Sequence, residues 1–466
     1  MPNNPPLKSA EAAVRPRPPR LYLIHGSGYG NVGDSAQMMA AAERLERVIP
    51  GCRLQVARMY AADDGLLWGG RDSAPSPHLY ICRPPGRFPS LIIGALSRLR
   101  ARSLAKSCKT GVFLFRAFLL VASAWCLKRT GILPVFHPAA KGALLAIRDC
   151  DLVYGSGGGN LNDLWLNEEL LPRVATYRVA AVLGKPVIVS GQGVGPVATR
   201  LGRRLLKWGA KDLSLFSCRD THASRDFLVS LGMDANVVQS LGDDATDLRC
   251  SPPDRIAAIA VAEAFPADGR PRVAVHVRLH DFKDDFRTLA IPLLASLFDQ
   301  LIERKGCRLV FIPVTFGETR TFEADLGDAA EVYANMKQRA HVSFVCREKY
   351  SPPDMLGLIR SCSMLIGFSY HAWVFALSSG IPAFGFYFGE YFRLKSIGLF
   401  DWYNRGHWIW NIETLQPESV LREIEEVDMN YGAHREALLS TTRRLAEQVE
   451  RPARLAGVMM EKLTNA

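Results

Sequence analysis

Short apolar segments, several of them ending in glycine-rich turns, alternate with helical patterns from Leu21 onward. The first unit reads "LYLIHGSGYGNVGDSAQMMAAAERL" over residues 21–45: an apolar run, four glycines and a segment of helical spacing. Two further glycine-rich turns, "GSGGGNLND" and "GQGVGP", follow the apolar segments that begin near 150 and 185. Strand–turn–helix units of this kind predict parallel sheets covered by helices, the α/β class.

The units form two series, which meet at the Pro-Pro pair of "CSPPDRI" (250–256). A chain of 466 residues is long enough for two domains with full cores. We therefore predict two Rossmann-like, doubly wound domains facing a cleft, over 21–250 and 251–466, the second ending in terminal helices. Residues 1–20 hold six prolines and no apolar run, so we expect a disordered tail and no signal peptide.

Cysteine usage and charge limit the function classes. The ten cysteines form no C-x-x-C pair and none stands at zinc-finger spacing from a histidine, which predicts a reduced, cytoplasmic chain without a structural metal. The net charge is +11, but residues 73–148 contain twelve Lys or Arg and no Asp or Glu, so the rest of the chain sums to −1. A basic surface that is so local does not predict a nucleic-acid partner.

The same basic segment, 73–148, contains the apolar run "GVFLFRAFLLVASAWCL" (111–127), which is short for a membrane-spanning helix. Two interpretations remain open. The segment is either an inserted helical pair that packs on the first domain with solvated charges, or a peripheral surface for an anionic membrane or acceptor. The second interpretation places the protein on the inner face of the membrane.

The first glycine-rich turn satisfies G-x-G-x-x-G over residues 28–33. A dinucleotide-binding turn requires an acidic residue at the end of the second strand, whereas "RLQVARM" (53–59) contains Arg58 near its end. Arg58 suits a 2′-phosphate, so NADP stays a minor alternative. Asp34 is expected to cap the following helix, which competes with phosphate binding.

"GYGNVGDSA" resembles the opening G-x-x-N-x-G-D-x-A of the polysaccharide pyruvyl transferase family. The resemblance runs from Leu21 to about Leu399, except for the basic segment. The further matching segments, in order, are "SGGGNLND" (156–163), "GQGVGP" (191–196), "SCRDTHASRDFLVSLG", "VAVHVR" and "LIGFSYHAWVFALSSGIPAFGFYF".

The resemblance implies two Rossmann-like domains similar to the glycosyltransferase B (GT-B) architecture. It also implies transfer of a pyruvyl group from phosphoenolpyruvate, a co-substrate, to two hydroxyls of a polysaccharide or lipid-linked glycan as a ketal. This chemistry requires no metal or further cofactor. His371 falls on the histidine of a family motif, and because histidine titrates near neutrality we predict it to be the general acid.

The resemblance and the strand-end positions together predict the residues of the cleft turns. We expect glycine to let backbone N–H groups approach a ligand, and Asp34 to cap its helix or hold acceptor hydroxyls. The predicted cleft residues are Gly30, Asn31, Gly33, Asp34, Gly157, Gly158, Gly159, Asn160, Gln192, Gly193, Arg219, Asp220 and Asp243.

The chain departs from the family at one motif. Where the family has Arg-Leu-His, this chain has Ser369-Tyr370-His371, and serine and tyrosine donate hydrogen bonds without charge. In the segment after the final strand, "FGEYFRLK", Glu390 stands near the place of a family lysine. Either the donor differs or another arginine binds it; the candidates are Arg278, Arg347 and Arg393. A GT-B-type enzyme with a nucleotide-sugar donor and a non-catalytic binding subunit remain alternatives.

Overall fold

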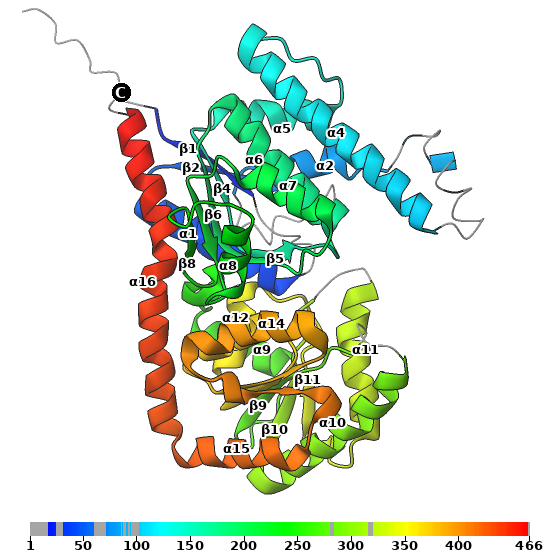
Figure 1. The fold of residues 1–466 in the computed structure, drawn as a ribbon. Helices are drawn as coiled ribbons and strands as arrows, with labels where there is room; N and C mark the ends of the chain where they lie inside the picture. Colours follow the sequence, from blue (N-terminus) through cyan, green and yellow to red (C-terminus); the bar gives the residue numbers. More distant parts are fainter. Residues whose placement is uncertain are drawn as a thin grey trace, which may run out of the picture.

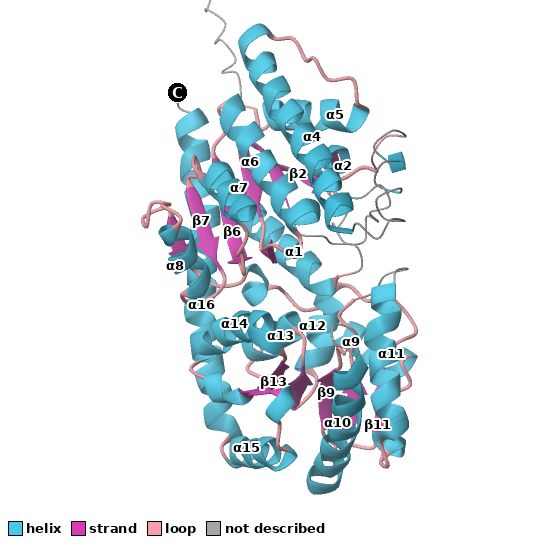
Figure 2. Ribbon diagram, turned by 45° about the vertical axis from the view of Figure 1, so that its right-hand side comes forward, coloured by secondary structure: helices cyan, strands magenta, loops and turns pink. Residues whose placement is uncertain are grey.

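The computed structural model describes residues 17–24, 31–59, 71–84, 102–279, 284–315 and 320–464, with the isolated positions 86, 90, 91 and 94. In this described part, two parallel β-sheets flanked by helices lie one above the other (Figure 1 and Figure 2). The predicted α/β class with two Rossmann-like domains is confirmed.

The first sheet has the strand order β3-β2-β1-β4-β6-β7-β8, and β5 pairs with β6. Its strands are β1 Arg20–Ile24, β2 Arg53–Arg58, β3 Ser73–Pro75, β4 Leu152–Gly155, β5 Gly158–Leu161, β6 Val187–Val194, β7 Leu215–Cys218 and β8 Val238–Ser240. The helices of this domain are α1 Val32–Val48, α2 Pro77–Ile81, α4 Arg102–Thr130, α5 Pro138–Asp149, η2 Leu166–Leu170, α6 Leu171–Leu183, α7 Arg200–Ala210, α8 Ala223–Ser230 and η3 Asp244–Asp247. Every residue of β4 is buried, as expected for a parallel strand covered on both faces.

The second sheet has the strand order β11-β10-β9-β12-β13-β14. Its strands are β9 Arg272–His276, β10 Arg308–Phe311, β11 Val342–Phe344, β12 Met364–Gly367, β13 Ala383–Tyr387 and β14 Ile409–Asn411. The longer helices are α9 Pro253–Ala262, α10 Asp284–Lys305, α11 Arg320–Asn335, α12 Pro352–Arg360, α13 Tyr370–Ser378, α14 Gly389–Phe400, α15 Pro417–Met429 and α16 Tyr431–Thr464. Short 3₁₀ turns are η4 Arg339–His341, η5 Asp401–Tyr403, η6 Gly406–Trp408 and η7 Ile412–Thr414.

Each sheet winds outward in both directions from its first strand. The winding changes direction between β1 and β4 in one sheet and between β9 and β12 in the other. Doubly wound sheets bind ligands outside the carboxyl ends of the strands at such switch points. Residues that follow all four of these strands line a single cavity, so the two switch points face each other.

Helices α1 and α16 join the two domains. Helix α1 packs against α12 and α13 of the second domain. Helix α16 runs along both domains in Figure 1: Leu439 lies beside Gly380, and further along Val449 lies beside Gly242 of the first domain. Apolar side chains of both domains therefore form one continuous core. The predicted second domain, 251–466, ends in terminal helices, and in the structure the second half of the last one packs on the first domain.

The basic segment is an integral part of the first domain. Strand β3 pairs with β2, while Phe113 and Leu120 of α4 and Leu144 of α5 enter the core on one face of the sheet. Helix α4 has 29 residues and extends well beyond the apolar run 111–127. The prediction of a helix too short to span a membrane is therefore wrong. Among the described residues, one helix, Ser103–Thr130, is long and apolar enough to cross a bilayer by length and composition alone.

Candidate functional site

A cavity of about 380 Å³ lies between the domains at the paired switch points. Sites for small molecules typically enclose about 300–1,000 Å³. The polar and charged residues of its lining are Asn31, Asp34, Asn160, Glu168, Glu169, Arg219, Arg278, Thr315, Ser369, Tyr370, His371, Lys395 and Ser396.

Helix α1 begins at this cavity, and its first turn contacts the second domain. Asn31 is the N-cap, and its side-chain oxygen accepts hydrogen bonds from the N–H groups of Gly33 (2.9 Å) and Asp34 (3.3 Å). The Val32 N–H donates to the Val314 carbonyl at 2.9 Å. The cap predicted for Asp34 is wrong because Asn31 occupies that position. The Asp34 carboxylate belongs to the cavity lining instead.

Helix α13 begins on the opposite side of the cavity, after β12. Ser369 is its N-cap, accepting a hydrogen bond from the Ala372 N–H at 3.3 Å. A β-carbon on Gly33 would lie 1.8 Å from His371 Nδ1, so the imidazole ring packs directly on the backbone of α1. Among the described residues, His371 Nε2 and the Tyr370 hydroxyl are buried without a hydrogen-bond partner. Buried polar atoms are normally paired, so both favour a ligand at this place.

Burial shifts the pKa values of two cavity residues in opposite directions. Burial and the nearby Arg219 and Lys395 lower the pKa of His371 well below its usual 6.5, so the ring is neutral at pH 7. The prediction that His371 titrates near neutrality is not supported, because burial and the two nearby cations lower its pKa. Burial and the nearby Glu169 raise the pKa of Asp34 from 3.8 to about 6. Asp34 therefore titrates close to neutrality.

The Arg219 guanidinium forms part of the cleft wall. Its Cζ atom lies 4.1 Å from the centre of the Tyr370 ring, and Nη1 lies 3.8 Å from the Asp243 carboxylate. β-Carbons on Gly159 and Gly193 would lie 2.4 and 2.7 Å from guanidinium nitrogens. These glycines make room for an arginine of the protein itself. The sequence predicts that they present N–H groups to a ligand, and the space beside them is occupied by Arg219.

Several predicted cleft residues lie one layer behind this wall. The Gly157 N–H donates to the Asp244 carboxylate at 2.8 Å, and a β-carbon on Gly158 would lie 3.3 Å from the Gln192 amide. The Asp243 carboxylate is buried, and burial raises its pKa to about 6. The expectation that Gly157 offers its N–H to a ligand is wrong, because a buried carboxylate already accepts it.

The described lining includes three basic side chains, Arg219, Arg278 and Lys395. Arg278 follows β9, as predicted from its strand-end position. Lys395 lies on α14 with its Nζ atom 5.5 Å from the centre of the Tyr370 ring. It is the last residue of "FGEYFRLK", so this segment does supply a lysine to the cavity. The sequence comparison missed it because only the residues directly after the strand were considered.

Two predicted donor-binding residues lie elsewhere. Arg347 is exposed after β11, and its N–H donates to the Glu263 carboxylate at 3.0 Å. Arg393 forms an ion pair with Glu390 at 2.6 Å on α14. Neither belongs to the cavity lining, because the short loop after β11 and the register of α14 direct them away from it. The predicted Gly30 lies outside the described residues.

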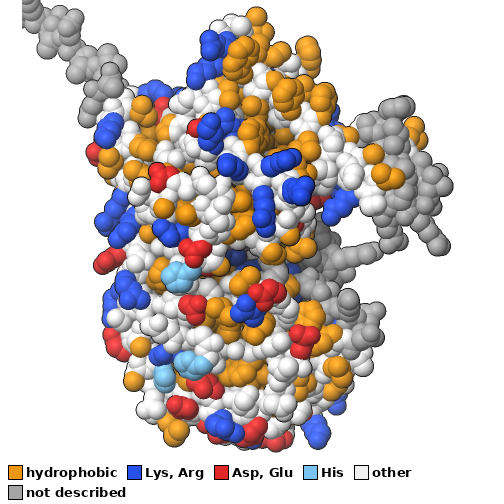
Figure 3. Space-filling model, viewed as in Figure 1, with side chains coloured by type: hydrophobic (Ala, Val, Ile, Leu, Met, Phe, Trp, Pro, Cys, Tyr) orange, Lys and Arg blue, Asp and Glu red, His pale blue; other side chains and the backbone are white. Residues whose placement is uncertain are grey.

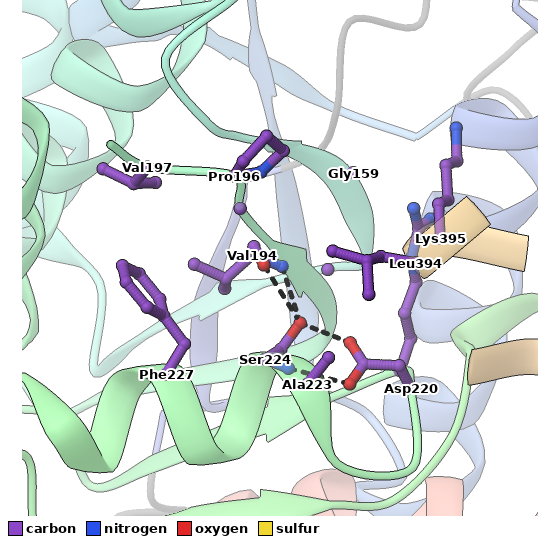
Figure 4. Close-up of a pocket in the computed structure, with 13 residues that line it drawn as sticks. Gly159, Val194, Pro196, Val197, Asp220, Ala223, Ser224, Phe227, Leu394 and Lys395 are labelled. Carbon is purple, nitrogen blue, oxygen red and sulfur yellow. Dashed lines mark hydrogen bonds between the residues drawn. The ribbon is translucent and has the colours of Figure 1, made fainter. Parts of the chain in front are cut away.

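A smaller cavity of about 160 Å³ adjoins the main one (Figure 4). The residues that line both are Gly159, Arg219 and Lys395. Figure 4 shows Ser224 bonded to Asp220 and to the backbone of Val194, with Leu394 on the side of the second domain. Asp220 accepts the Ser224 N–H at 2.8 Å, so this carboxylate fixes the start of α8. Within the described chain, no group of three or more His, Cys, Asp or Glu side chains could hold a metal ion.

The two facing Rossmann-like domains, with a charged cavity between them, define a GT-B-like protein. Solved structures support this fold at low sequence identity. HepE of Anabaena, in complex with UDP-glucose, has a TM-score of 0.53 at 11% identity, over 96% of this chain and 100% of that one. The UDP-GlcNAc 2-epimerase of Neisseria meningitidis has a TM-score of 0.52 at 9% identity, over 92% and 98%. The corresponding enzyme of Methanocaldococcus jannaschii has a TM-score of 0.52 at 10% identity, over 87% and 91%.

The sequence identifies the family within this class. Residues 31–389 match the polysaccharide pyruvyl transferase family, and the chain belongs to it. No curated protein gives a significant sequence match.

Proposed function

We propose that this protein transfers the pyruvyl group of phosphoenolpyruvate to two hydroxyls of a polysaccharide or lipid-linked glycan, releasing phosphate. One observation carries the proposal: the N-termini of α1 and α13 meet at a cavity lined by three basic side chains, with Asp34 and His371 between them. Helix N-termini and cations together favour a ligand with several negative charges, such as a phosphate and a carboxylate on one small molecule.

The cationic residues of the cavity take the place of the family arginine that is Ser369 here. Arg219 is fixed between two glycines and the Tyr370 ring, and Lys395 of α14 lies near the same ring. Arg278 enters from the end of β9. We propose that these three residues bind the donor, while Ser369 caps α13.

The reaction moves protons at two places. The donor methylene gains a proton and becomes a methyl group, its central carbon bonds to two acceptor oxygens, and the carbon–oxygen bond to phosphate breaks. The acceptor hydroxyls lose two protons in total: one balances the proton that the methylene gains, and the other leaves with the phosphate. We assign the first transfer to His371, which lines the cavity with the proposed donor-binding residues. Burial is the main cause of its low pKa and Arg219 and Lys395 add to it, whereas the negative charges of a bound donor would act in the opposite direction. We assign Asp34, whose pKa is about 6, to the acceptor protons. No cofactor besides the co-substrate takes part in this scheme.

Phosphate release from phosphoenolpyruvate tests this proposal. The full-length protein is incubated with a panel of glycans, and mass spectrometry detects the gain of one pyruvyl group on the acceptor. We expect His371→Gln to lower turnover by about 100-fold or more, in the range of lost general acid catalysis, while a cooperative melting transition shows that the variant is folded. His407→Gln, at an exposed histidine, serves as the matched control. Equal turnover by His371→Gln and the control would remove His371 from the mechanism.

Two alternatives have different outcomes. A nucleotide-sugar donor is suggested by the sugar nucleotides named with the structures of similar fold. Thermal protection by UDP-glucose or UDP-GlcNAc, with none from phosphoenolpyruvate, would support that donor.

A non-catalytic binding subunit is suggested by Ser369, and it would bind glycans without turnover of any donor. The cytoplasmic location belongs to our proposal, supported by the ten cysteines being unbridged.

A further inference from the structure

Helix α4 exposes an apolar face along much of its length. Its inner face is buried, and Phe113 and Leu120 belong to the core of the first domain. Its outer face carries Phe115, Phe118 and Trp125, which are 61%, 67% and 57% exposed. The exposed positions of this outer face recur at helical spacing: Leu104, Cys108, Gly111, Phe115, Phe118, Ala122 and Trp125. Monomeric soluble proteins rarely expose a continuous apolar surface of this kind.

The apolar surface continues past the end of α4. In the loop to α5, Ile132 is 64% exposed and Phe136 is 97% exposed. Figure 3 shows hydrophobic atoms gathered over the upper part of the first domain, where Figure 1 places α4 and α5. We call the exposed surface formed by Leu104, Cys108, Gly111, Phe115, Phe118, Ala122, Trp125, Ile132 and Phe136 the α4 face.

Positive charges lie near both ends of the α4 face. Lys106 and Arg129 are exposed near the two ends of the helix, and no acidic residue occurs between Ser73 and Arg148. Helix α6 packs between α4 and α7, so α7 adds a second basic row nearby. Figure 3 shows Lys and Arg atoms in the region of α7. The exposed basic residues of that row are Arg200, Arg203, Arg204, Lys207 and Lys211.

We propose that the α4 face lies flat in the headgroup region of an anionic lipid bilayer. An exposed apolar helix face with cations beside it is the composition of interfacial membrane helices. Spanning is disfavoured although α4 is long enough, because it would remove Phe113 and Leu120 from the protein core. A second copy of the chain is disfavoured as well, because pairing two α4 faces would bring the basic residues beside each face close to those of the other copy.

The α4 face is connected with the candidate active site. A groove of about 530 Å³ runs between Lys106 and Lys109 of α4 and the segment 163–168. Leu164 and Trp165 line both this groove and the main cavity, and they are 65% and 49% exposed. Docking through α4 would therefore hold the cavity entrance beside the lipid headgroups. This consequence rests on the proposed function, since it suits a lipid-linked acceptor; the membrane binding itself does not.

Vesicle co-sedimentation of the full chain tests the proposal. We use vesicles of equal parts phosphatidylglycerol and phosphatidylcholine, compared with pure phosphatidylcholine. The wild type should sediment with the anionic vesicles, and Phe118→Glu or Trp125→Glu should reduce the bound fraction at least tenfold. Val261→Glu, at a site 79% exposed on α9, is the matched control and should bind like the wild type. Lys128→Glu with Arg129→Glu should remove the preference for phosphatidylglycerol and its sensitivity to salt.

Three outcomes would overturn the proposal: a wild type that stays in the supernatant, equal binding by Phe118→Glu, or a wild-type dimer that Phe118→Glu converts to monomer without any vesicle binding. The last outcome would assign the α4 face to a second copy. Equal melting temperatures of the variants exclude unfolding. Phosphate release with a soluble acceptor should be unchanged in Phe118→Glu, so failure of membrane binding and failure of the proposed reaction are distinguishable.

Discussion

Asp34 and His371 line the same cavity from different domains, and burial affects them in opposite ways. It raises the pKa of the carboxyl group to about 6 and lowers the pKa of the imidazole well below 6.5. Both pKa values are thus displaced from their ordinary values of 3.8 and 6.5, and strongly perturbed titratable groups in a cleft are typical of functional sites. At pH 7 Asp34 is mostly ionised and His371 is neutral, so each can accept a proton, and each can donate one only after a change in its surroundings.

A raised carboxyl pKa also predicts a stability effect. Folded Asp34 binds its proton more tightly than unfolded Asp34, so its contribution to stability is lost as the pH rises from about 4 to about 6. A rise of about two units in the pKa corresponds to roughly 3 kcal/mol in the free energy of unfolding. We expect Asp34→Asn to be more stable than the wild type by up to that amount at pH 7.5, with a smaller difference at pH 4.5. Urea unfolding at both pH values measures this.

The control for this comparison is Asp226→Asn, because the Asp226 side chain is 67% exposed. We expect it to change the free energy of unfolding by less than about 0.5 kcal/mol at either pH. A stability advantage of Asp34→Asn over the wild type that does not grow from pH 4.5 to pH 7.5, relative to this control, would contradict this expectation. Ionisation of Asp34 would then not destabilise the folded protein.

At the scale of elements, the site depends on a close contact between the first turns of α1 and α13. The contact joins the domains because Gly33 has no side chain and the His371 ring fills that space. Both helices are capped by side chains, Asn31 and Ser369, which leaves their first turns ordered at the cavity. The family pattern N-x-G-D thus has a structural reason. Asn31 caps the helix, Gly33 contacts the His371 ring, and Asp34 lines the cavity.

Gly33→Ala tests this contact. The added β-carbon would lie 1.8 Å from His371 Nδ1, so either the ring or α1 must move. We expect phosphate release to fall at least tenfold and the free energy of unfolding to fall by about 1–3 kcal/mol, as for overpacked sites. Gly327→Ala in α11 is the matched control, because a β-carbon there meets no atom within 4 Å. If Gly33→Ala keeps full turnover, His371 does not need its present position.

Much of this arrangement could be predicted from the sequence, because strand–turn–helix units are local patterns. Asn31 and His371 were predicted at the cavity from the family motifs together with their positions after strands, and Arg278 from its strand-end position. The use of Gly159 and Gly193 could not be predicted, because it depends on where Arg219, distant in sequence, places its guanidinium. Lys395 required the register of α14, which the weak periodicity of that segment does not provide.

For the whole molecule, the sequence predicted two doubly wound domains but not how they are held together. The apolar spacing of the C-terminal segment predicts a helix, but it does not indicate on which domain that helix packs. In the structure, α16 buries Leu438 near its start and Val449, Ala453 and Ala456 further along. Its later part contacts α1 and η3 of the first domain. One core therefore includes residues of both sheets, and the cavity lies between domains that are linked on one side.

This continuity predicts that the two domains unfold together. Ala453 is completely buried on α16, so Ala453→Asp places an unpaired charge in the shared core, at a cost of about 3–5 kcal/mol. In differential scanning calorimetry we expect a single transition for the wild type and a single transition at lower temperature for Ala453→Asp. Ala437→Asp, at an exposed position of the same helix, should leave the melting temperature nearly unchanged. Two separated transitions, with only one displaced by Ala453→Asp, would show instead that each domain is stable alone and that α16 merely rests on the first.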